Sequence, residues 1–455
     1  MEWVANFVSD HLEWLGVGSF ALVGYWGVSR RKKHHKTGKK LLEKAIKTKM
    51  DEPLTMHPHV DPVLCAGCGS CTRVCPEGGI VNLINHKAVL VAPTKCVGHG
   101  ECEVACPTGA ISLVFGTKTR GMDIPRITTD YETNVPGLYI AGELGGMGLI
   151  RNAVKQGGLA AQHALRNLPN GAKADTDLLV IGAGPAGLTA ALTAIQQKKS
   201  YICIDQNSFG GTVYHFPRQK IVMTIPADLP IVGQMKFKNN KVSKEELLSY
   251  WNDVRQQTKL QVREQVRFES LLKEGDVFNV KTSAGQITAK KVILALGVRG
   301  SPRKLGLPNE DSGKVTYNLV DPEQYQDQHI AVVGGGNAGV ECAQYLANPK
   351  LRNKVKLLVR GKVFDRCNEE NQRIINEMAA KKEVEIWYES SVGEIHPDRL
   401  VVKKEDKAVT IPNQFLFVFA GAESPHKMLM SYGIQIDKKF GEALGSSGVK
   451  KPRKV

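Results

Sequence analysis

Residues 177–188, DLLVIGAGPAGL, decide the fold of the larger part of the chain. The apolar run Leu178–Ile181 predicts a buried strand. Three glycines follow it with the spacing G-x-G-x-x-G, namely Gly182, Gly184 and Gly187. Such glycines permit a tight turn and let backbone N–H groups and a helix N-terminus approach a pyrophosphate. A second apolar run ends at Asp205, where such units place an acid for a ribose hydroxyl. This order of features predicts a dinucleotide-binding βαβ unit.

A second unit of the same kind begins near residue 330. The stretch HIAVVGGGNAGVECAQYL carries the same glycine pattern, with Gly334, Gly336 and Gly339. Its second strand ends at Val359, and the cations Arg360, Lys362 and Arg366 follow where a site for NAD would have an acid. Cations there suit a 2′-phosphate, so NADP(H) is favoured and NAD(H) is the alternative. Two such units, separated by β-rich sequence, predict an α/β fold with two doubly wound dinucleotide-binding domains.

Three further stretches extend this pattern to a known layout. The runs KKVILALGVRG and QFLFVFAGAESP resemble the strands that lead out of the FAD domain and close the NAD(P) domain in two-dinucleotide flavoproteins. Residues 177–437 are therefore similar to the thioredoxin-reductase-like flavoproteins, and VYHFPRQK is closer to the bacillithiol-disulfide-reductase branch. The resemblance implies FAD at the first glycine motif and nicotinamide at the second. Three residues just past the second strand are expected near the flavin, namely Gly210, Gly211 and Thr212.

The sequence departs from that family in its cysteines. The nicotinamide domain has no C-x-x-C, and Ala186 stands where the bacillithiol-disulfide-reductase branch carries a cysteine. Disulfide reduction by either route is therefore not expected. Three cysteines in this part are isolated in sequence and are expected to be packing residues, namely Cys203, Cys342 and Cys367.

One segment is out of order relative to the family. Flavoproteins of this layout end with a second FAD contact that resembles T-x-x-P-G-[LIV]-Y-A-x-G-D and is followed by a helix. Here TNVPGLYIAGE (133–143) and GGLAAQHAL (157–165) precede the first glycine motif. We infer a circular permutation, with Gly142 and Glu143 as FAD contacts and Glu143 in place of the aspartate. Because domain termini are often close together, such a move need not change the fold.

Seven of the ten cysteines crowd into two motifs. The first, C-x2-C-x2-C-x3-C-P, has the spacing of the bacterial ferredoxin run, in which three thiolates hold one cluster and the fourth crosses to the other. The second has the same spacing, with His99 in place of the second cysteine. The pair resembles the two-cluster bacterial ferredoxins. A secreted disulfide framework is disfavoured because dinucleotide cofactors belong to the cytosol.

The ferredoxin resemblance implies the cluster ligands. One [4Fe-4S] cluster is expected on Cys65, Cys68, Cys71 and Cys106. The second cluster is expected on Cys75, Cys96 and Cys102. The role of His99 stays open between a ligand of a four-iron cluster, a bystander to a three-iron cluster, and a surface residue with no second cluster. Replacing thiolate with imidazole raises the cluster potential in the Rieske case.

The amino-terminal segment predicts a membrane anchor. The apolar stretch Trp14–Val28 is followed by RRKKHHKTGKK (30–40), and acids rather than bases precede it. This charge order is unlike a signal peptide, and the positive-inside rule would leave the bulk of the protein in the cytoplasm. We therefore expect a single-pass protein of the inner (cytoplasmic) membrane in contact with membrane lipids, with an amphipathic or partner-binding helix as the alternative. The net charge of +16 does not indicate nucleic-acid binding, because neither a recognition fold nor aromatic–basic interleaving accompanies it.

These features predict eight segments along the 455 residues. They are a membrane helix (1–28), a basic connector (29–56), a small α+β ferredoxin domain (57–117), the relocated part of the FAD domain (118–168), the main FAD domain (169–302), the NAD(P) domain (303–415), a return to the FAD domain (416–438) and a basic tail (439–455).

The motifs together predict electron transfer. A flavin exchanges two electrons with nicotinamide and single electrons with a cluster, so it converts between the two. We expect electrons to pass between NADPH, FAD and the clusters, to or from an external redox partner, and the fusion is expected to seat a cluster near the flavin ring. One alternative is reduction of a quinone or another small molecule at the flavin. Another is a redox-sensing or docking subunit with little turnover. A homodimer stays open.

Overall fold

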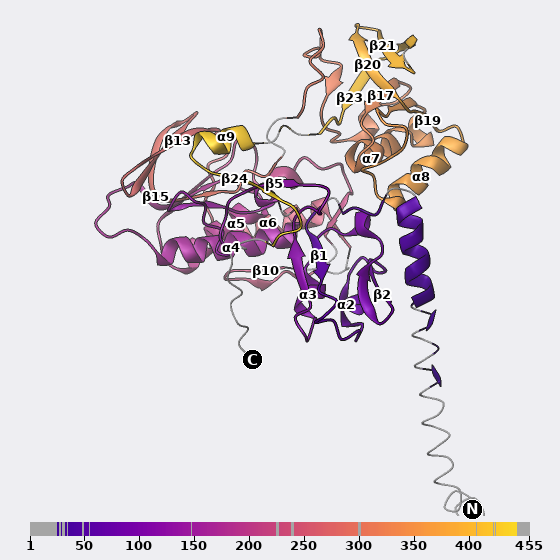
Figure 1. Cartoon of the computed structure of the whole chain (residues 1–455). Helices are drawn as coiled ribbons and strands as arrows, with labels where there is room; N and C mark the ends of the chain where they lie inside the picture. Colours follow the sequence, from indigo (N-terminus) through magenta and orange to yellow (C-terminus); the bar gives the residue numbers. More distant parts are fainter. Residues whose placement is uncertain are drawn as a thin grey trace, which may run out of the picture. The chain divides into compact units, whose positions relative to one another are not determined.

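The computed structural model divides the chain into two compact units, which meet in sequence between Val114 and Phe115. Figure 1 traces both units from the amino to the carboxyl end. The structure describes residues 25–443, apart from 27–28, 30–31, 34, 48–49, 54, 147, 224–226, 238–240, 299–301, 406, 422 and 424.

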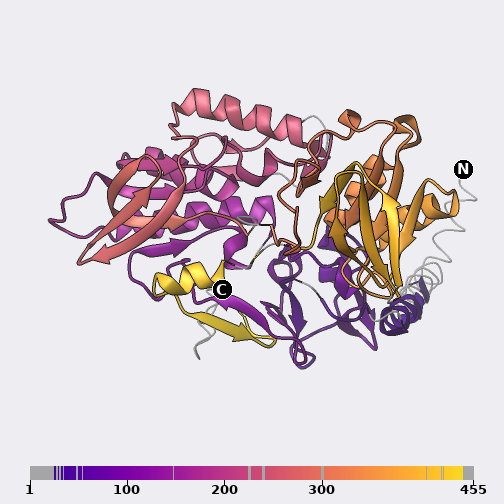
Figure 2. The ribbon, with the colours of Figure 1, turned by 90° about the horizontal axis from the view of Figure 1, so that it is seen from above.

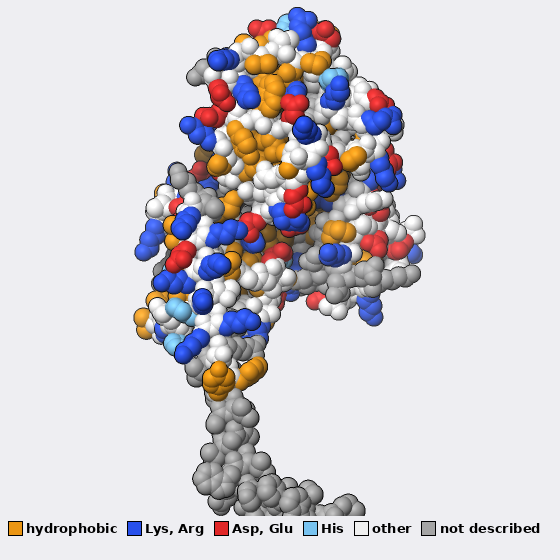
Figure 3. Space-filling model, turned by 90° about the vertical axis from the view of Figure 1, so that its right-hand side faces the viewer, with side chains coloured by type: hydrophobic (Ala, Val, Ile, Leu, Met, Phe, Trp, Pro, Cys, Tyr) orange, Lys and Arg blue, Asp and Glu red, His pale blue; other side chains and the backbone are white. Residues whose placement is uncertain are grey.

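A basic helix over residues 35–47 belongs to the first unit. Lys, Arg and His side chains gather over this part of the chain (Figure 3). The helix lies against the following hairpin, since Nδ1 of His35 accepts the Asn85 N–H at 3.2 Å. A Cβ added at Gly38 would lie 3.1 Å from Ile84. Part of the predicted basic connector is therefore helical and packs on this hairpin.

The described residues include no helix that is both long and apolar enough to cross a bilayer. This finding contradicts the predicted single-pass location at the inner membrane, and that prediction is wrong. Its charge-order argument rested on a basic run that, where it is described, docks on a hairpin. The predicted anchor itself (1–28) lies almost wholly outside the described residues, as does most of the predicted basic tail (439–455).

The cysteine motifs form a small α+β body with two antiparallel strand pairs. Strand β1 (His57–Val60) pairs with β4 (Ile111–Val114), and β2 (Val81–Ile84) pairs with β3 (Lys87–Leu90). The two motifs fold alike, because each continues through a left-handed glycine into a short helix. Gly69 precedes α2 (Ser70–Val74), and Gly100 precedes α3 (Glu101–Val104). A short 3-10 turn, η1 (Pro93–Lys95), leads into the second motif.

The second unit begins with a mixed sheet built around the first glycine motif. Its parallel strands are β7 (Thr176–Ile181), β8 (Tyr201–Ile204), β15 (Gly285–Leu294) and β6 (Leu138–Ile140). The sheet continues past β15 through the antiparallel strands β14 (Val277–Thr282) and β13 (Phe268–Glu274). Residues Leu178–Ile181 of β7 are apolar and buried, as expected of a parallel strand covered on both faces.

Helices pack beside this sheet. Helix α5 (Pro185–Gln196) follows the glycine motif and lies against α4 (Ile150–Arg166), which comes from the sequence before it (Figure 1). Helix α6 (Lys244–Thr258) begins at a capping box between Ser243 and Glu246. Its Trp251 and Leu247 are fully buried in the same core.

Short elements lie between β8 and α6, and one more short helix lies near the carboxyl end of the described residues. They are η3 (Gly211–Val213), β9 (Ile221–Met223), β10 (Asp228–Leu229), β11 (Gly233–Gln234), β12 (Val242–Ser243) and α9 (His426–Ser431). Strand β12 pairs with β9, and β10 pairs with β11.

The second glycine motif lies in a separate parallel sheet with the strand order β16-β23-β17-β18-β19. These strands are β16 (Val315–Thr316), β23 (Phe415–Val418), β17 (His329–Val333), β18 (Lys354–Leu358) and β19 (Val384–Trp387). Helices α7 (Asn337–Leu346) and α8 (Glu369–Ala380) accompany it, with the turns η4 (Pro322–Gln324) and η5 (Pro349–Leu351). Strands β20 (Ser390–Ile395), β21 (Arg399–Lys404) and β22 (Lys407–Pro412) form a layer of their own (Figure 2). Strand β23 begins at Phe415, the residue at which the sequence predicts this domain to end.

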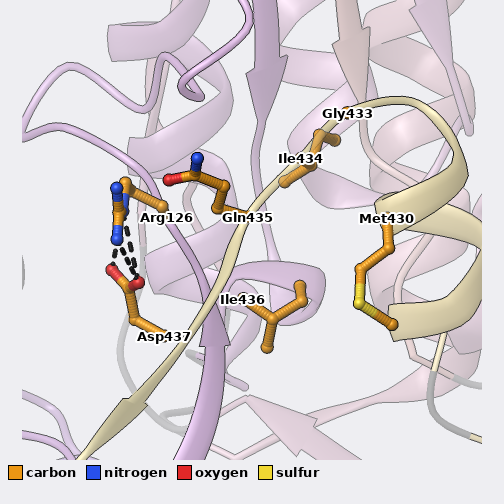
Figure 4. Close-up of a pocket in the computed structure, with 7 residues that line it drawn as sticks. All are labelled: Arg126, Met430, Gly433, Ile434, Gln435, Ile436 and Asp437. Carbon is orange, nitrogen blue, oxygen red and sulfur yellow. Dashed lines mark hydrogen bonds and ion pairs between the residues drawn. The ribbon is translucent and has the colours of Figure 1, made fainter.

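The carboxyl-terminal segment pairs with the start of the second unit. Strand β24 (Ile436–Lys439) is antiparallel to β5 (Met122–Pro125). Figure 4 shows Arg126 and Asp437 facing each other across this pair, and Nη2 of Arg126 donates to Asp437 at 2.7 Å. A shallow pocket there is lined by Arg126, Met430, Gly433, Ile434, Gln435, Ile436 and Asp437, and it contains none of the predicted site residues.

Candidate cofactor sites

The first glycine turn is crowded at two of its glycines and open at the third. A Cβ at Gly182 would lie 2.4 Å from the carbonyl oxygen of Ala295, and one at Gly187 would lie 1.7 Å from that of Gly182. Gly182 also has a φ of 108°, in the left-handed region. At Gly184 the nearest atom is 3.9 Å away. The backbone at Gly184 therefore leaves room for a phosphate at the start of α5, which fits a bound dinucleotide.

The acid at the end of β8 holds this turn in place. Asp205 is 8% exposed, and its two carboxylate oxygens accept the N–H groups of Ala183 at 2.7 Å and Asn207 at 2.8 Å. Each oxygen has a second acceptor position, so the carboxylate can also accept from a ribose hydroxyl.

The predicted flavin neighbours Gly210, Gly211 and Thr212 lie beside the same turn. The Gly210 N–H donates to the Ala183 carbonyl at 3.1 Å. A Cβ at Gly211 would lie 2.9 Å from Gly184 Cα. The hydroxyl of Thr212 lies 3.9 Å from the Cβ position of Gly297, just after β15. This turn thus stands at the carboxyl ends of the parallel strands, where doubly wound sheets bind ligands.

The out-of-order segment reaches the same place from the other side. Strand β6 is parallel to β15, with Leu138 opposite Val292 and Ile140 opposite Leu294. Directly after β6, a Cβ at Gly142 would lie 3.3 Å from the Ala186 side chain. Glu143 opens the 3-10 turn η2 (Glu143–Gly145). The structure therefore brings Gly142 to the first glycine motif.

Gln156 was not among the predicted site residues. It is 2% exposed, and its Oε1 accepts the Gly142 N–H at 2.7 Å. A long amide on the buried face of α4, next to two glycines, is the signal that could have revealed it.

The second glycine turn repeats the pattern of the first. A Cβ at Gly334 would lie 2.4 Å from the Phe419 carbonyl oxygen, and one at Gly339 would lie 2.3 Å from that of Gly334. A Cβ at Gly336 would meet nothing within 4 Å. Gly336 caps α7 in an extended conformation, so the start of this helix is also open to a phosphate.

The predicted cations differ in their surroundings. Arg360 is exposed at the end of β18. Nζ of Lys362 lies 3.5 Å from the Glu389 carboxylate, which partly offsets its charge. The backbone of Arg366 forms a β-bridge with Gly336 of the second glycine turn.

Four thiols converge in the first unit, as the ferredoxin spacing implies. The thiols of Cys65, Cys68 and Cys106 are close enough to Cys71 to act on its charge. Burial raises the pKa of Cys71 to about 11, and the charges of these neighbouring thiols contribute to the same rise. Backbone N–H groups point at two of the sulfurs, from Ala88 to Cys65 at 3.4 Å and from Ala110 to Cys106 at 3.3 Å. N–H···S contacts of this kind are among the factors that tune a cluster.

A second set of thiols surrounds a cavity. Cys75, Cys96 and Cys102 line it together with His99. Burial raises the pKa of Cys102 to about 12, and the charges of Cys96 and Cys75 contribute to the same rise. Nε2 of His99 lies 4.0 Å from Glu77. The structure thus brings His99 to the same cavity as the three thiols.

These two thiol sets suit clusters better than single ions. Among the described residues, no three His, Cys, Asp or Glu side chains are arranged to hold one metal ion. In a cluster each thiolate binds a different iron, so its ligands stand further apart than those of one ion. At neutral pH the raised pKa values keep Cys71 and Cys102 protonated, so iron binding must displace their protons.

The three remaining cysteines belong to the second unit. Cys203 is 2% exposed in the core of the first sheet, and Cys342 and Cys367 are buried in the core of the second. All three pack in apolar cores, as the sequence predicts.

Comparisons with known proteins agree with this arrangement. Residues 179–445 match the family described as "Pyridine nucleotide-disulphide oxidoreductase", and residues 57–107 match "4Fe-4S dicluster domain". The chain is 26% identical over 270 residues to "Bacilliredoxin reductase Bdr" of Bacillus subtilis, covering 58% of this chain and 82% of the relative. It is 34% identical over 172 residues to a ferredoxin–NADP reductase of Ignicoccus hospitalis, covering 38% of this chain and 52% of the relative, about half its length.

Among solved structures, the "Bacillithiol Disulfide Reductase Bdr (YpdA) from Bacillus cereus" is similar over 58% of this chain and 82% of its own. The TM-score is 0.52 and the sequence identity is 25%.

Proposed function

The chain belongs to the pyridine nucleotide-disulphide oxidoreductase family, and from this premise we propose that it passes electrons between NADPH, FAD and iron–sulfur clusters, to or from an external redox partner protein. It is an FAD-dependent NAD(P)H oxidoreductase that carries a 4Fe-4S dicluster ferredoxin domain. The convergence of Cys65, Cys68 and Cys106 on Cys71 carries the proposal, because a reductase that acted only at its flavin would not need this thiol set.

The bound cofactors and the chain have separate tasks. FAD, when bound, supplies the exchange between the two-electron chemistry of nicotinamide and the one-electron chemistry of a cluster. The residues of the chain bind these cofactors and orient them. The open backbone at Gly184 and Gly336 admits the pyrophosphates, and Asp205 fixes the first turn. Arg360, an exposed cation just past β18, is the residue that we assign to the 2′-phosphate of NADPH.

Disulfide reduction, which the names of the Bdr relatives describe for those proteins, is not part of this proposal. Cys203, Cys342 and Cys367 are buried in packed cores, and burial raises the pKa of Cys203 to about 12. A thiol in such surroundings is a poor nucleophile.

The proposed second cluster is bound by Cys75, Cys96 and Cys102, beside His99. Two forms fit this ligand set: a four-iron cluster with His99 as the fourth ligand, and a three-iron cluster without it. Their EPR signals distinguish them.

We also propose that residues 118–168 are the carboxyl-terminal part of the FAD domain, moved ahead of its first strand. The parallel pairing of β6 with β15 supports this origin, and so does the packing of α4 on α5. The ferredoxin unit is then joined to the reductase through this segment.

Removing two ligands of the first cluster tests the electron path. In the double variant Cys65→Ala, Cys68→Ala we expect NADPH to reduce the flavin at an unchanged rate, while reduction of a ferredoxin-type acceptor protein falls at least about a hundredfold. Cys342→Ala, which removes a buried cysteine outside both thiol sets, is the matched control and should keep both rates.

Two results would point to the other functions. If the double variant reduces its acceptor, protein or quinone, at the full rate, the chemistry stays at the flavin. If the unaltered protein binds FAD but hardly oxidises NADPH with artificial acceptors, the chain is a sensor or docking subunit.

A further inference from the structure

Four buried side-chain polar atoms in the described part of the chain have no hydrogen-bond partner, and one of them lies at the flavin site. They are His215 Nε2, Trp251 Nε1, Ser312 Oγ and Asn413 Oδ1. Trp251 of α6 is fully buried in the apolar core beside the first sheet. Ser312 and Asn413 belong to the domain of the second sheet. His215 alone follows the turn beside the first glycine motif.

The backbone places His215 at the carboxyl ends of the parallel strands. Its N–H donates to the Thr212 carbonyl at 3.2 Å, which continues the turn that begins at Gly210. The same turn contacts Gly184 through Gly211 and faces Gly297 through Thr212. These contacts lie on the side of the sheet where the open backbone of Gly184 leaves room for a dinucleotide.

The Tyr214 side chain packs against the His215 ring. The ring of Tyr214 lies edge-on to it, with centroids 5.5 Å apart and an interplanar angle of 80°. Lys244 lies 6.0 Å from the centre of the Tyr214 ring, and its Nζ donates to the Phe216 carbonyl at 2.6 Å. The imidazole thus has one ring contact, while its Nε2 is shielded from water and has no hydrogen-bond partner in the protein.

A shielded imidazole nitrogen that lacks a partner is costly, because burial removes its hydrogen bonds to water. A neutral imidazole nitrogen is either a donor or an acceptor, so it can bond to either kind of polar atom on a ligand. We propose that Nε2 of His215 forms a hydrogen bond with the bound FAD and that His215 is a positioning residue for the flavin. The inference rests on the proposed function only in taking FAD as the occupant of this site.

Paired substitutions test this assignment in the full-length protein. FAD is removed, the protein is titrated with FAD, and the dissociation constant is followed by flavin fluorescence; the midpoint potential of the bound flavin is measured separately. We expect His215→Leu to raise the dissociation constant about tenfold and to shift the potential. His215→Gln keeps a polar side chain and should stay within about threefold.

Trp251→Phe is the matched control, because it also removes a buried nitrogen without a partner. It should leave the FAD dissociation constant and the flavin potential unchanged. If His215→Leu does not fold, His215→Asn replaces it, because the shorter amide cannot reach the position of Nε2, and the same tenfold loss is expected.

The outcomes separate this inference from the proposed function. Unchanged FAD binding and flavin potential in the His215→Leu or His215→Asn variant would overturn the role of His215 alone, as would an equal loss in Trp251→Phe. An unaltered protein that bound no FAD would instead overturn the proposed function.

Discussion

In each dinucleotide turn, two glycines are required by close backbone packing and one faces open space. At Gly334 and Gly339 an added Cβ would collide with backbone oxygens, whereas at Gly336 it would meet nothing within 4 Å. A side chain at Gly336 would therefore intrude only on a ligand. The same contrast holds in the first turn between Gly187 and Gly184.

The substitution Gly336→Ala tests this division. We expect normal folding and flavin content, because Gly336 has the extended backbone that alanine also adopts. We expect the KM for NADPH to rise about tenfold or more, since the Cβ would meet the pyrophosphate. Steady-state kinetics measures this. Gly313→Ala, which also adds a Cβ in open space, is the control. An unchanged KM in Gly336→Ala would mean that nicotinamide binds elsewhere.

Glu310 is a buried carboxylate that organises the start of the nicotinamide domain. It is 5% exposed and accepts the N–H groups of Leu305 at 2.5 Å and Gly306 at 2.7 Å, and the Tyr317 hydroxyl at 2.8 Å. Burial opposes its ionisation, but these donors outweigh burial and hold the pKa of Glu310 below its ordinary value. Its contribution to stability is therefore present above the unfolded pKa and lost as pH falls through the lower folded pKa.

The substitution Glu310→Gln should lower the free energy of unfolding by about 1–3 kcal/mol at pH 7, because it leaves buried donors short of an acceptor. Thermal unfolding at pH 7 and at acidic pH measures this. The loss should shrink as the pH falls below the carboxylate range, since the unaltered protein then loses the same charge. Glu323→Gln is the control, because the Glu323 side chain is 78% exposed. Equal stability of the Glu310→Gln and Glu323→Gln variants at pH 7 would contradict this account.

A helix of the out-of-order segment packs directly on the helix of the first glycine motif. Helix α4 lies so close to α5 that a Cβ at Gly157 would be 2.0 Å from the Ala186 carbonyl oxygen. At the next residue, Gly158, the nearest contact is the Thr189 methyl group at 3.3 Å. Helix α4 of the out-of-order segment is therefore in close backbone contact with α5, the helix that starts at the first glycine turn.

These adjacent glycines provide a matched pair of variants. Gly157→Ala should push α4 away from α5, lower the stability by about 1–3 kcal/mol and lower the flavin content of the purified protein. Gly158→Ala should cost less, because a side-chain methyl group can shift where a backbone carbonyl cannot. Flavin absorbance per chain and the unfolding temperature are the measurements. If the two variants lose flavin equally, α4 does not set the FAD site.

The local sequence predicted the strands and turns that carry a recognisable motif. The contacts between these elements could not be predicted, because they depend on tertiary packing. The strand at TNVPGLYIAGE could be recognised because its motif is intact in the sequence, and β6 lies parallel to β15. The hydrogen bond from the Gly142 N–H to Gln156 depends on how α4 packs against the end of β6. Likewise, the acid beside Lys362 is Glu389, which reaches it from beyond β19, so spacing around Arg360 could not reveal it.

The whole molecule combines a reductase with a cluster-binding unit, and this combination defines the proposed electron path. The membrane location inferred from the amino-terminal charge order is wrong. Hydropathy over a short stretch could not show that the adjacent basic residues form a helix docked on the β2–β3 hairpin. The redox assignment does not depend on that segment, because it rests on the thiol sets and the two glycine turns.

An EPR-monitored redox titration of the full-length protein, with NADPH as the reductant, tests the electron path most directly. We predict that NADPH alone produces the signal of a reduced iron–sulfur cluster, and that the double variant Cys65→Ala, Cys68→Ala loses the signal of the first cluster while its flavin is still bleached. The same spectra count the clusters and reveal a three-iron species beside His99 if one forms. A protein whose flavin is fully reduced by NADPH while every cluster stays oxidised, although dithionite reduces those clusters, would contradict the account.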